Sequence, residues 1–185
     1  MKGVVFVEFL EMVEDRFSPE IADRIIEASD LPSGGAYTGI GSYDHAEMVQ
    51  LVTQLSAATG TPAPVLVHTF GKYMFGRFAV LYPQLFEGIE SAYSLLEKID
   101  STIHVEVRKL YPDAELPRFE CNTSEPGRLT LIYRSPRGFA DLAAGLIEGC
   151  IEHFGDTIDV QREDLSGGQG TQVRFSLSKR AHERD

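Results

Sequence analysis

Residues 128–137 have the sequence Arg-Leu-Thr-Leu-Ile-Tyr-Arg-Ser-Pro-Arg, and this stretch decides how the fold is interpreted. Its apolar and β-branched residues predict a β-strand over 128–134. Because the side chains of a strand alternate between two faces, Tyr133, Ser135 and Arg137 are expected on one face. A phenol, a hydroxyl and a planar guanidinium suit carboxylates, which arginine binds bidentately. The same pattern also arises by chance, from a packed tyrosine, a turn serine and a solvated arginine.

The sequence around this strand predicts a small antiparallel sheet with one helix. Segments 124–127 and 166–170 are rich in serine, glycine and proline and indicate turns between strands. The predicted elements are strands at 118–121 and 128–134, a helix at 138–154, and strands at 158–162 and 171–177.

The N-terminal part of the chain predicts helices instead. Ser18, followed by a proline and an acidic residue, is typical of a helix start. Asp44 is expected to cap a further helix, and Gly60 to end it. The predicted elements are helices over the first dozen residues, 20–28, 45–59 and 64–82, with a loop over 31–42.

A longer helix is expected between residues 89 and 111, where an apolar stripe runs as far as the proline at 112. His104 lies on the border of this stripe. A neutral imidazole is a common iron ligand, and a histidine on the inward edge of a helix can face a metal. A lone helical histidine is more often a packed or capping residue.

Together these elements predict an α+β fold in a single domain over residues 1–185. A helical N-terminal lobe over 1–62 is joined to a lobe over 63–185 that contains a small antiparallel sheet and helices. The hydrophobic content of 43% is ordinary for a soluble globular protein of this length.

The charge of the chain excludes several classes of partner. A formal net charge of −11 repels phosphate backbones and anionic lipids, so neither nucleic acid nor a membrane is an expected partner. The sequence shows no leader peptide and no apolar run long enough to span a bilayer, which predicts a cytoplasmic protein.

Two other kinds of site receive little support. Cys150 and His153 are spaced for one helical face, and Cys121 can approach them, but two thiols and one histidine fall short of a closed tetrahedral zinc site. A hydrolase that uses Ser135 lacks a nucleophile elbow.

The chain resembles the haem nitric oxide/oxygen binding (H-NOX) domains, which are related to the haem sensor domain of soluble guanylate cyclase. The resemblance extends over nearly the whole chain and rests on elements in the family's order. These elements are Met-Lys-Gly at 1–3, His104 followed by Tyr111-Pro112 and Leu116-Pro117-Arg118-Phe119, the signature Tyr-x-Ser-x-Arg at 133–137, and Gly-Leu-Ile-Glu-Gly at 145–149.

The resemblance implies a haem b cofactor (iron protoporphyrin IX) and a role for each matching residue. His104 corresponds to the axial ligand of the iron, and Tyr133, Ser135 and Arg137 correspond to the residues that hold the haem propionates. Pro117 matches the proline that presses on the porphyrin and distorts it. We therefore expect the haem to lie between the two lobes.

The gas that is bound can be predicted from what the chain lacks. Oxygen-binding members of the family carry a distal tyrosine supported by tryptophan and asparagine, whereas the matching positions here are Leu142, Phe9 and Met74. Dioxygen needs a hydrogen-bond donor above the iron, and nitric oxide does not. The expected distal pocket is apolar and comprises Val5, Phe9, Met74, Phe78, Leu142 and Leu146. The same six residues would also suit an ordinary hydrophobic core.

These features predict a nitric oxide sensor, with carbon monoxide as a further ligand, rather than an enzyme. The resemblance implies that nitric oxide breaks the bond between iron and His104, which frees the helix and shifts the lobes. Since no kinase or cyclase region follows, the expected effector is a separate histidine kinase or diguanylate cyclase. The alternatives are an oxygen sensor, or a haem-free ligand-binding or protein-interaction module.

Overall fold

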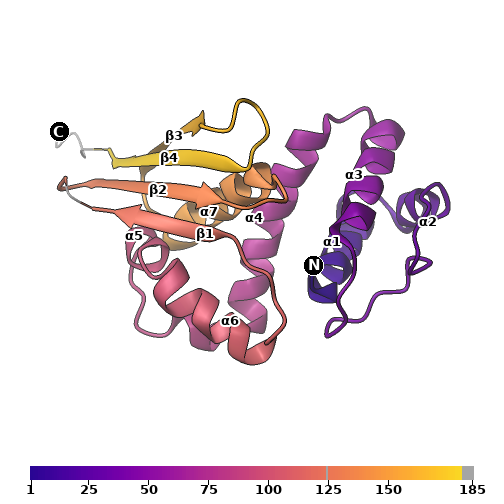
Figure 1. The fold of residues 1–185 in the computed structure, drawn as a ribbon, viewed down its shortest axis with the longest axis horizontal. Helices are drawn as coiled ribbons and strands as arrows, with labels where there is room; N and C mark the ends of the chain where they lie inside the picture. Colours follow the sequence, from indigo (N-terminus) through magenta and orange to yellow (C-terminus); the bar gives the residue numbers. More distant parts are fainter. Residues whose placement is uncertain (124, 181–185) are drawn as a thin grey trace.

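The computed structural model of the protein describes residues 1–123 and 125–180. Figure 1 shows a helical N-terminal lobe and a mixed C-terminal lobe, with helix α4 between them. The predicted α+β fold class is confirmed. The N-terminal lobe contains α1 (Gly3–Arg16), α2 (Pro19–Glu27) and α3 (His45–Thr59).

Helices α2 and α3 begin at the side chains that were predicted to cap them. Ser18 Oγ accepts a hydrogen bond from the Ile21 N–H at 3.3 Å, and Asp44 Oδ1 accepts one from the Ala46 N–H at 2.9 Å. Gly60 ends α3 in the left-handed conformation, with a φ of 72°. The predicted helices of this lobe are therefore confirmed to within a few residues.

Helix α4 (Ala63–Leu81) contributes to the cores of both lobes. Met74 is buried in the N-terminal core, whereas its neighbour Phe75 is buried in the C-terminal core. The predicted division of the chain at residue 62 falls at the start of this shared helix and stays a prediction.

The single helix predicted between residues 89 and 111 is wrong. The structure has three shorter elements in this region: α5 (Ala92–Leu96), a π-helix (Ile99–Ile103) and α6 (His104–Leu110). A 3-10 helix (Pro83–Phe86) precedes them. In the π-helix the Ile103 N–H donates to the Lys98 carbonyl oxygen at 3.0 Å, which widens the turn just before His104.

The π-helix before His104 makes a tertiary contact. Asp100, within the π-helix, accepts a hydrogen bond from the backbone N–H of Phe119, which lies in the first strand of the sheet. The apolar stripe predicts helical spacing but contains no information about this partner, because the strand follows much later in the sequence.

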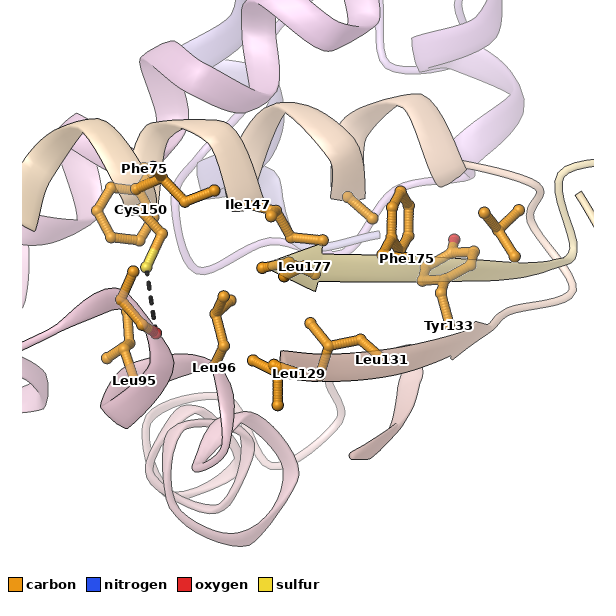
Figure 2. Close-up of a cluster of buried hydrophobic side chains, with 14 of the residues drawn as sticks. Phe75, Leu95, Leu96, Leu129, Leu131, Tyr133, Ile147, Cys150, Phe175 and Leu177 are labelled. Carbon is orange, nitrogen blue, oxygen red and sulfur yellow. Dashed lines mark hydrogen bonds between the residues drawn. The ribbon is translucent and has the colours of Figure 1, made fainter. Parts of the chain in front are cut away.

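The sheet of the C-terminal lobe is antiparallel, in the order β1-β2-β4-β3. Its strands are β1 (Arg118–Asn122), β2 (Arg128–Arg134), β3 (Ile158–Asp164) and β4 (Gln172–Lys179), as predicted to within a few residues. Helix α7 (Ala140–Phe154) lies across one face, and Figure 2 shows its side chains meeting those of β2 and β4 in the C-terminal core. Ser124, the first residue of one predicted turn, lies outside the described residues.

Within residues 1–123 and 125–180, no helix combines the length and the hydropathy needed to cross a bilayer.

Candidate functional site

A cavity of about 290 Å³ lies between the two lobes, with almost entirely apolar walls. Its walls come from α1, α4, the 3-10 helix, α5, the π-helix, α6, β1, β2, α7 and the segment 111–117, which we call the strap. Ten of the residues that the sequence singled out line this cavity: Val5, Met74, Phe78, His104, Pro117, Tyr133, Ser135, Arg137, Leu142 and Leu146.

Phe9 is the one predicted pocket residue that the structure places elsewhere. Its fully buried ring packs edge to face against Phe70, with ring centroids 5.2 Å apart, in the N-terminal core. Val5, one helical turn earlier in α1, does line the cavity. Phe9 therefore does not line the cavity. It packs against Phe70 of α4, whereas Met74, one helical turn later in α4, lines the cavity.

His104 is the first residue of α6 and is buried at the cavity wall. Its Nδ1 lies 2.7 Å from Oδ1 of Asp100, one helical turn earlier. Burial lowers the pKa of the imidazole, and the charge and hydrogen bond of Asp100 oppose this only in part. With a neutral ring whose Nδ1–H is donated to Asp100, the lone pair is on Nε2, as in imidazoles that bind metals.

Tyr133 lies near the end of β2 and Ser135 directly follows the strand, and both form part of the cavity lining. Tyr133 is buried, and this burial raises the pKa of its phenol. The Ser135 N–H donates to the Thr171 carbonyl oxygen at 2.9 Å, which ties the strand end to the β3-β4 hairpin. Ser135 Oγ in turn accepts from the Arg137 N–H at 3.3 Å. These contacts hold the segment in a defined turn.

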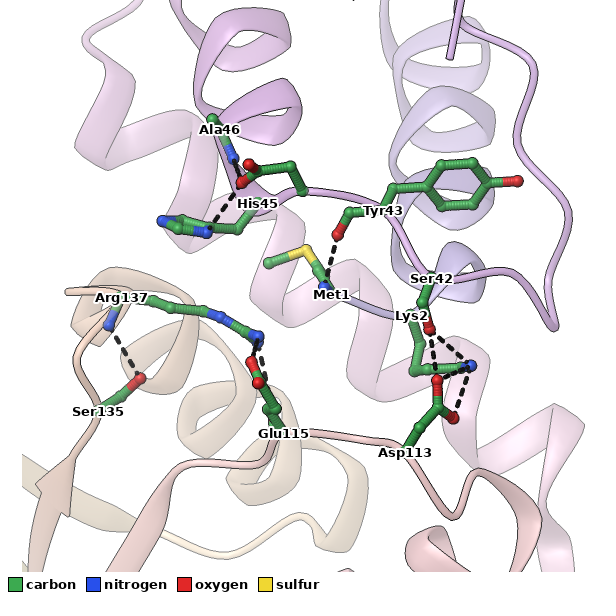
Figure 3. Close-up of polar contacts among 11 residues, drawn as sticks. Met1, Lys2, Ser42, Tyr43, His45, Ala46, Asp113, Glu115, Ser135 and Arg137 are labelled. Carbon is green, nitrogen blue, oxygen red and sulfur yellow. Dashed lines mark hydrogen bonds and ion pairs between the residues drawn. The ribbon is translucent and has the colours of Figure 1, made fainter. Parts of the chain in front are cut away.

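Arg137 extends from this turn toward the strap, as Figure 3 shows. Its Nη1 donates to the Glu115 carbonyl oxygen at 3.2 Å, and its Nη2 donates to the Glu115 carboxylate. Tyr133, Ser135 and Arg137 therefore reach one cavity as predicted, although Ser135 and Arg137 lie beyond the strand itself.

Two residues that sequence reasoning did not assign to the site support it directly. Asp100 orients His104, and its position four residues before the histidine is a signal that the sequence contains. Phe119 packs its ring 6.1 Å from the His104 ring and 5.5 Å from the Tyr133 ring, measured between centroids. Phe119 thus connects the two ends of the site, and only its pairing with Tyr133 across β1 and β2 reveals this.

The donor set fits a haem group. An apolar cavity suits the porphyrin faces, a neutral imidazole on one wall suits the iron, and a guanidinium, a hydroxyl and a phenol grouped at one edge suit carboxylates. The thiols provide no comparable site, because Cys121 is exposed whereas Cys150 is buried and its pKa is raised to about 12. Within residues 1–123 and 125–180, no cluster of three or more His, Cys, Asp or Glu side chains is arranged to hold a metal ion.

Comparison with known proteins identifies the family of the chain. The sequence profile of the family described as Haem-NO-binding matches residues 2–162. The chain belongs to this family. Its members, the H-NOX proteins, are haem-binding gas sensors. No protein with a curated description matches the chain.

Solved H-NOX structures share both fold and sequence with this H-NOX chain. The Fe(II) unliganded crystal structure of the H-NOX protein from K. algicida is 39% identical, with a TM-score of 0.93 and coverage of 100% of both chains. The solution structure of the H-NOX protein from Shewanella woodyi, in the Fe(II)CO ligation state, is 39% identical. Its TM-score is 0.84, with coverage of 100% of this chain and 97% of that one.

A more distant relative supports the fold alone. The H-NOX protein from S. oneidensis, in the Fe(II)NO ligation state, is 24% identical, with a TM-score of 0.90. The alignment covers 98% of this chain and 100% of that one.

Proposed function

We propose that this H-NOX domain binds haem b in the cavity between its lobes and acts as a nitric oxide sensor. The observation that carries the proposal is the His104 imidazole, oriented by Asp100 on the wall of an apolar cavity whose edge also holds Arg137. A histidine that serves only as a core residue does not account for the cationic and hydroxyl groups at the same cavity.

Each residue has a distinct role in this proposal. His104 would offer Nε2 to the iron, while burial keeps the ring neutral and Asp100 orients it. Tyr133, Ser135 and Arg137 would hold the propionates, and Pro117 on the strap would contact the porphyrin. When bound, the haem supplies an iron atom with an open coordination position for a diatomic gas.

The wall proposed to face the gas is apolar. Val5, Met74, Phe78, Leu142 and Leu146 bring no hydrogen-bond donor to the cavity. Dioxygen, which depends on such a donor, is therefore disfavoured, whereas nitric oxide and carbon monoxide do not require one. This contrast favours a nitric oxide sensor over the alternative of an oxygen sensor.

The position of His104 suits transmission of a signal. His104 begins α6, and α6 continues into the strap, where Asp113 contacts the N-terminal lobe and Glu115 contacts Arg137. A displacement of His104 therefore reaches the interface between the lobes within one continuous segment. We propose that a separate histidine kinase or diguanylate cyclase is the effector that responds to this change.

The absorption spectrum of His104→Gly, with and without free imidazole, tests the proposal. We expect the native chain to give the spectrum of histidine-ligated ferrous haem, and this spectrum to change when nitric oxide is added. His104→Gly should lose the protein-derived axial ligand and regain a comparable spectrum with free imidazole. His45→Gly, which replaces a histidine at the first position of α3, is the control and should keep the native spectrum.

Three outcomes would contradict the proposal. A colourless native protein after reconstitution with haem would favour the haem-free interaction module. Axial ligation that persists in His104→Gly without imidazole would exclude His104 as the ligand. A native spectrum that changes reversibly with air would favour the oxygen sensor.

A further inference from the structure

The guanidinium of Arg137 is largely withdrawn from water, with only 17% of its side chain exposed. A cation in this position needs an anionic partner, because the loss of hydration is costly when no charge compensates it. Both terminal nitrogens of Arg137 bind one residue, Glu115: Nη1 binds its carbonyl oxygen, and Nη2 binds its carboxylate.

The two contacts with Glu115 differ in how easily they can be exchanged. The carbonyl oxygen belongs to the backbone of the strap and keeps the guanidinium pointing toward it. The carboxylate belongs to a side chain that is 80% exposed, so it can rotate into water at little cost. Among the described residues it has no other hydrogen bond or ion pair.

The strap itself is fixed on its other side. Asp113 accepts hydrogen bonds from Lys2 Nζ at 3.0 Å and from Ser42 Oγ at 2.7 Å, as Figure 3 shows. Because the strap backbone is tied to the N-terminal lobe in this way, an exchange at Arg137 requires rotation of the Glu115 side chain and no movement of the strap.

We infer that the Glu115 carboxylate occupies Arg137 in place of a ligand carboxylate. When a dicarboxylate porphyrin binds, one of its carboxylates replaces Glu115 at Arg137. This inference rests on the proposed function of the cavity. Glu115 then stabilises the haem-free chain and opposes haem uptake. These opposite effects distinguish a substitute carboxylate from a residue that has only a structural role.

The test compares the haem affinities of Glu115→Gln and Glu120→Gln. Each affinity is obtained from the rate of haem association and the rate of haem transfer to a reference apoprotein. Glu120 pairs with Arg134 on β1 and β2, so its substitution removes the same charge from a similar ion pair that does not line the cavity. Each variant is measured with iron protoporphyrin IX and with its dimethyl ester, which lacks the carboxylates.

We expect Glu115→Gln to bind iron protoporphyrin IX about two- to fivefold more tightly than the native chain, as for the loss of one competing exposed ion pair. Its affinity for the dimethyl ester should match that of the native chain, and Glu120→Gln should match the native chain with both porphyrins. In urea, the haem-free forms of both variants should be slightly less stable than the native chain.

Several results would overturn the inference. Competition for Arg137 would be excluded if Glu115→Gln equalled Glu120→Gln in affinity, bound haem more weakly than the native chain, or showed the same gain with the dimethyl ester. In these cases the native chain still binds haem, so the proposed function stands. A native chain that takes up neither porphyrin would instead remove the proposed function and this inference with it.

Discussion

Asp100 binds His104 and Phe119 with its two carboxylate oxygens. Oδ1 lies 2.7 Å from Nδ1 of His104, and Oδ2 accepts the backbone N–H of Phe119 at 2.9 Å. One side chain thus joins the start of α6 to strand β1 and fixes the direction of the imidazole. The rotation of a histidine ring determines whether its free nitrogen faces the cavity.

Asp100→Asn should weaken the haem-binding site without unfolding the chain. The amide oxygen can still accept from Phe119, but the negative charge that favours the Nδ1–H form of His104 is lost. Loss of such a partner typically costs about 10- to 100-fold in metal affinity. Measured rates of haem loss should show this change, and Glu106→Gln, which alters an exposed carboxylate on α6, should show none.

A side chain at Gly71 should destabilise the fold, because α4 and α7 pack closely there. A Cβ there would lie 2.4 Å from the Leu142 carbonyl oxygen and 2.9 Å from the Cα of Gly145. We expect Gly71→Ala to lower the free energy of unfolding by about 1–3 kcal/mol through overpacking.

Gly76→Ala is the matched control on the same helix, because nothing lies within 4 Å of a Cβ at this exposed position. It should raise the free energy of unfolding by about 0.5–1 kcal/mol, as expected for alanine in place of glycine in a helix. Urea unfolding of both variants measures the difference. Equal stabilities would show that the helices separate freely at Gly71.

Leu142→Tyr should give the cavity the hydrogen-bond donor that its apolar wall lacks. Relative to Leu142→Phe, which adds the ring without the hydroxyl, we expect the tyrosine variant to bind dioxygen at least about tenfold more tightly, as for one hydrogen bond to a charged group. Oxygen titration of the ferrous haem-loaded variants measures this ratio. If the two variants bound dioxygen equally, the phenol would not reach the gas.

The contact between the strap and the N-terminal lobe should depend on acidic pH. Hydrogen bonds from Ser42 and Lys2 lower the pKa of Asp113 from 3.8 to about 2. A carboxyl group whose pKa is lower in the folded than in the unfolded chain stabilises the fold above the unfolded value, and this stabilisation is lost as the pH falls through the folded value.

Between pH 4 and pH 2, unfolding of the native chain should therefore depend more steeply on pH than unfolding of Asp113→Asn. Asp23→Asn, a substitution on the exposed face of α2, should keep the native dependence. Thermal unfolding across this pH range measures both slopes. Parallel curves for the native chain and Asp113→Asn would show that the contact contributes nothing.

Most of the elements could be predicted from local signals. The caps at Ser18 and Asp44 and the left-handed Gly60 act within a few residues of the helix ends that they determine. The strands follow the alternation of apolar and polar residues, and the same alternation brought Tyr133 and Ser135 together. The assignment of His104 came from its resemblance to a family motif rather than from its helix.

Other features depend on partners that are remote in the sequence. The π-helix before His104 is joined through Asp100 to a backbone amide in β1, and Phe9 packs against Phe70. The contact between Arg137 and Glu115 joins a turn to the strap, and no local pattern in either segment indicates it.

The amino-acid sequence by itself thus determined the α+β class, most helix and strand boundaries, the family and the donor types of the site, because these depend on periodicity, caps and motifs over short distances. Only the tertiary structure decided which way the His104 ring faces, which apolar side chains form the cavity wall and which carboxylate neutralises Arg137. Those outcomes depend on how separate elements pack, and the contacts that select them lie between residues far apart in the chain.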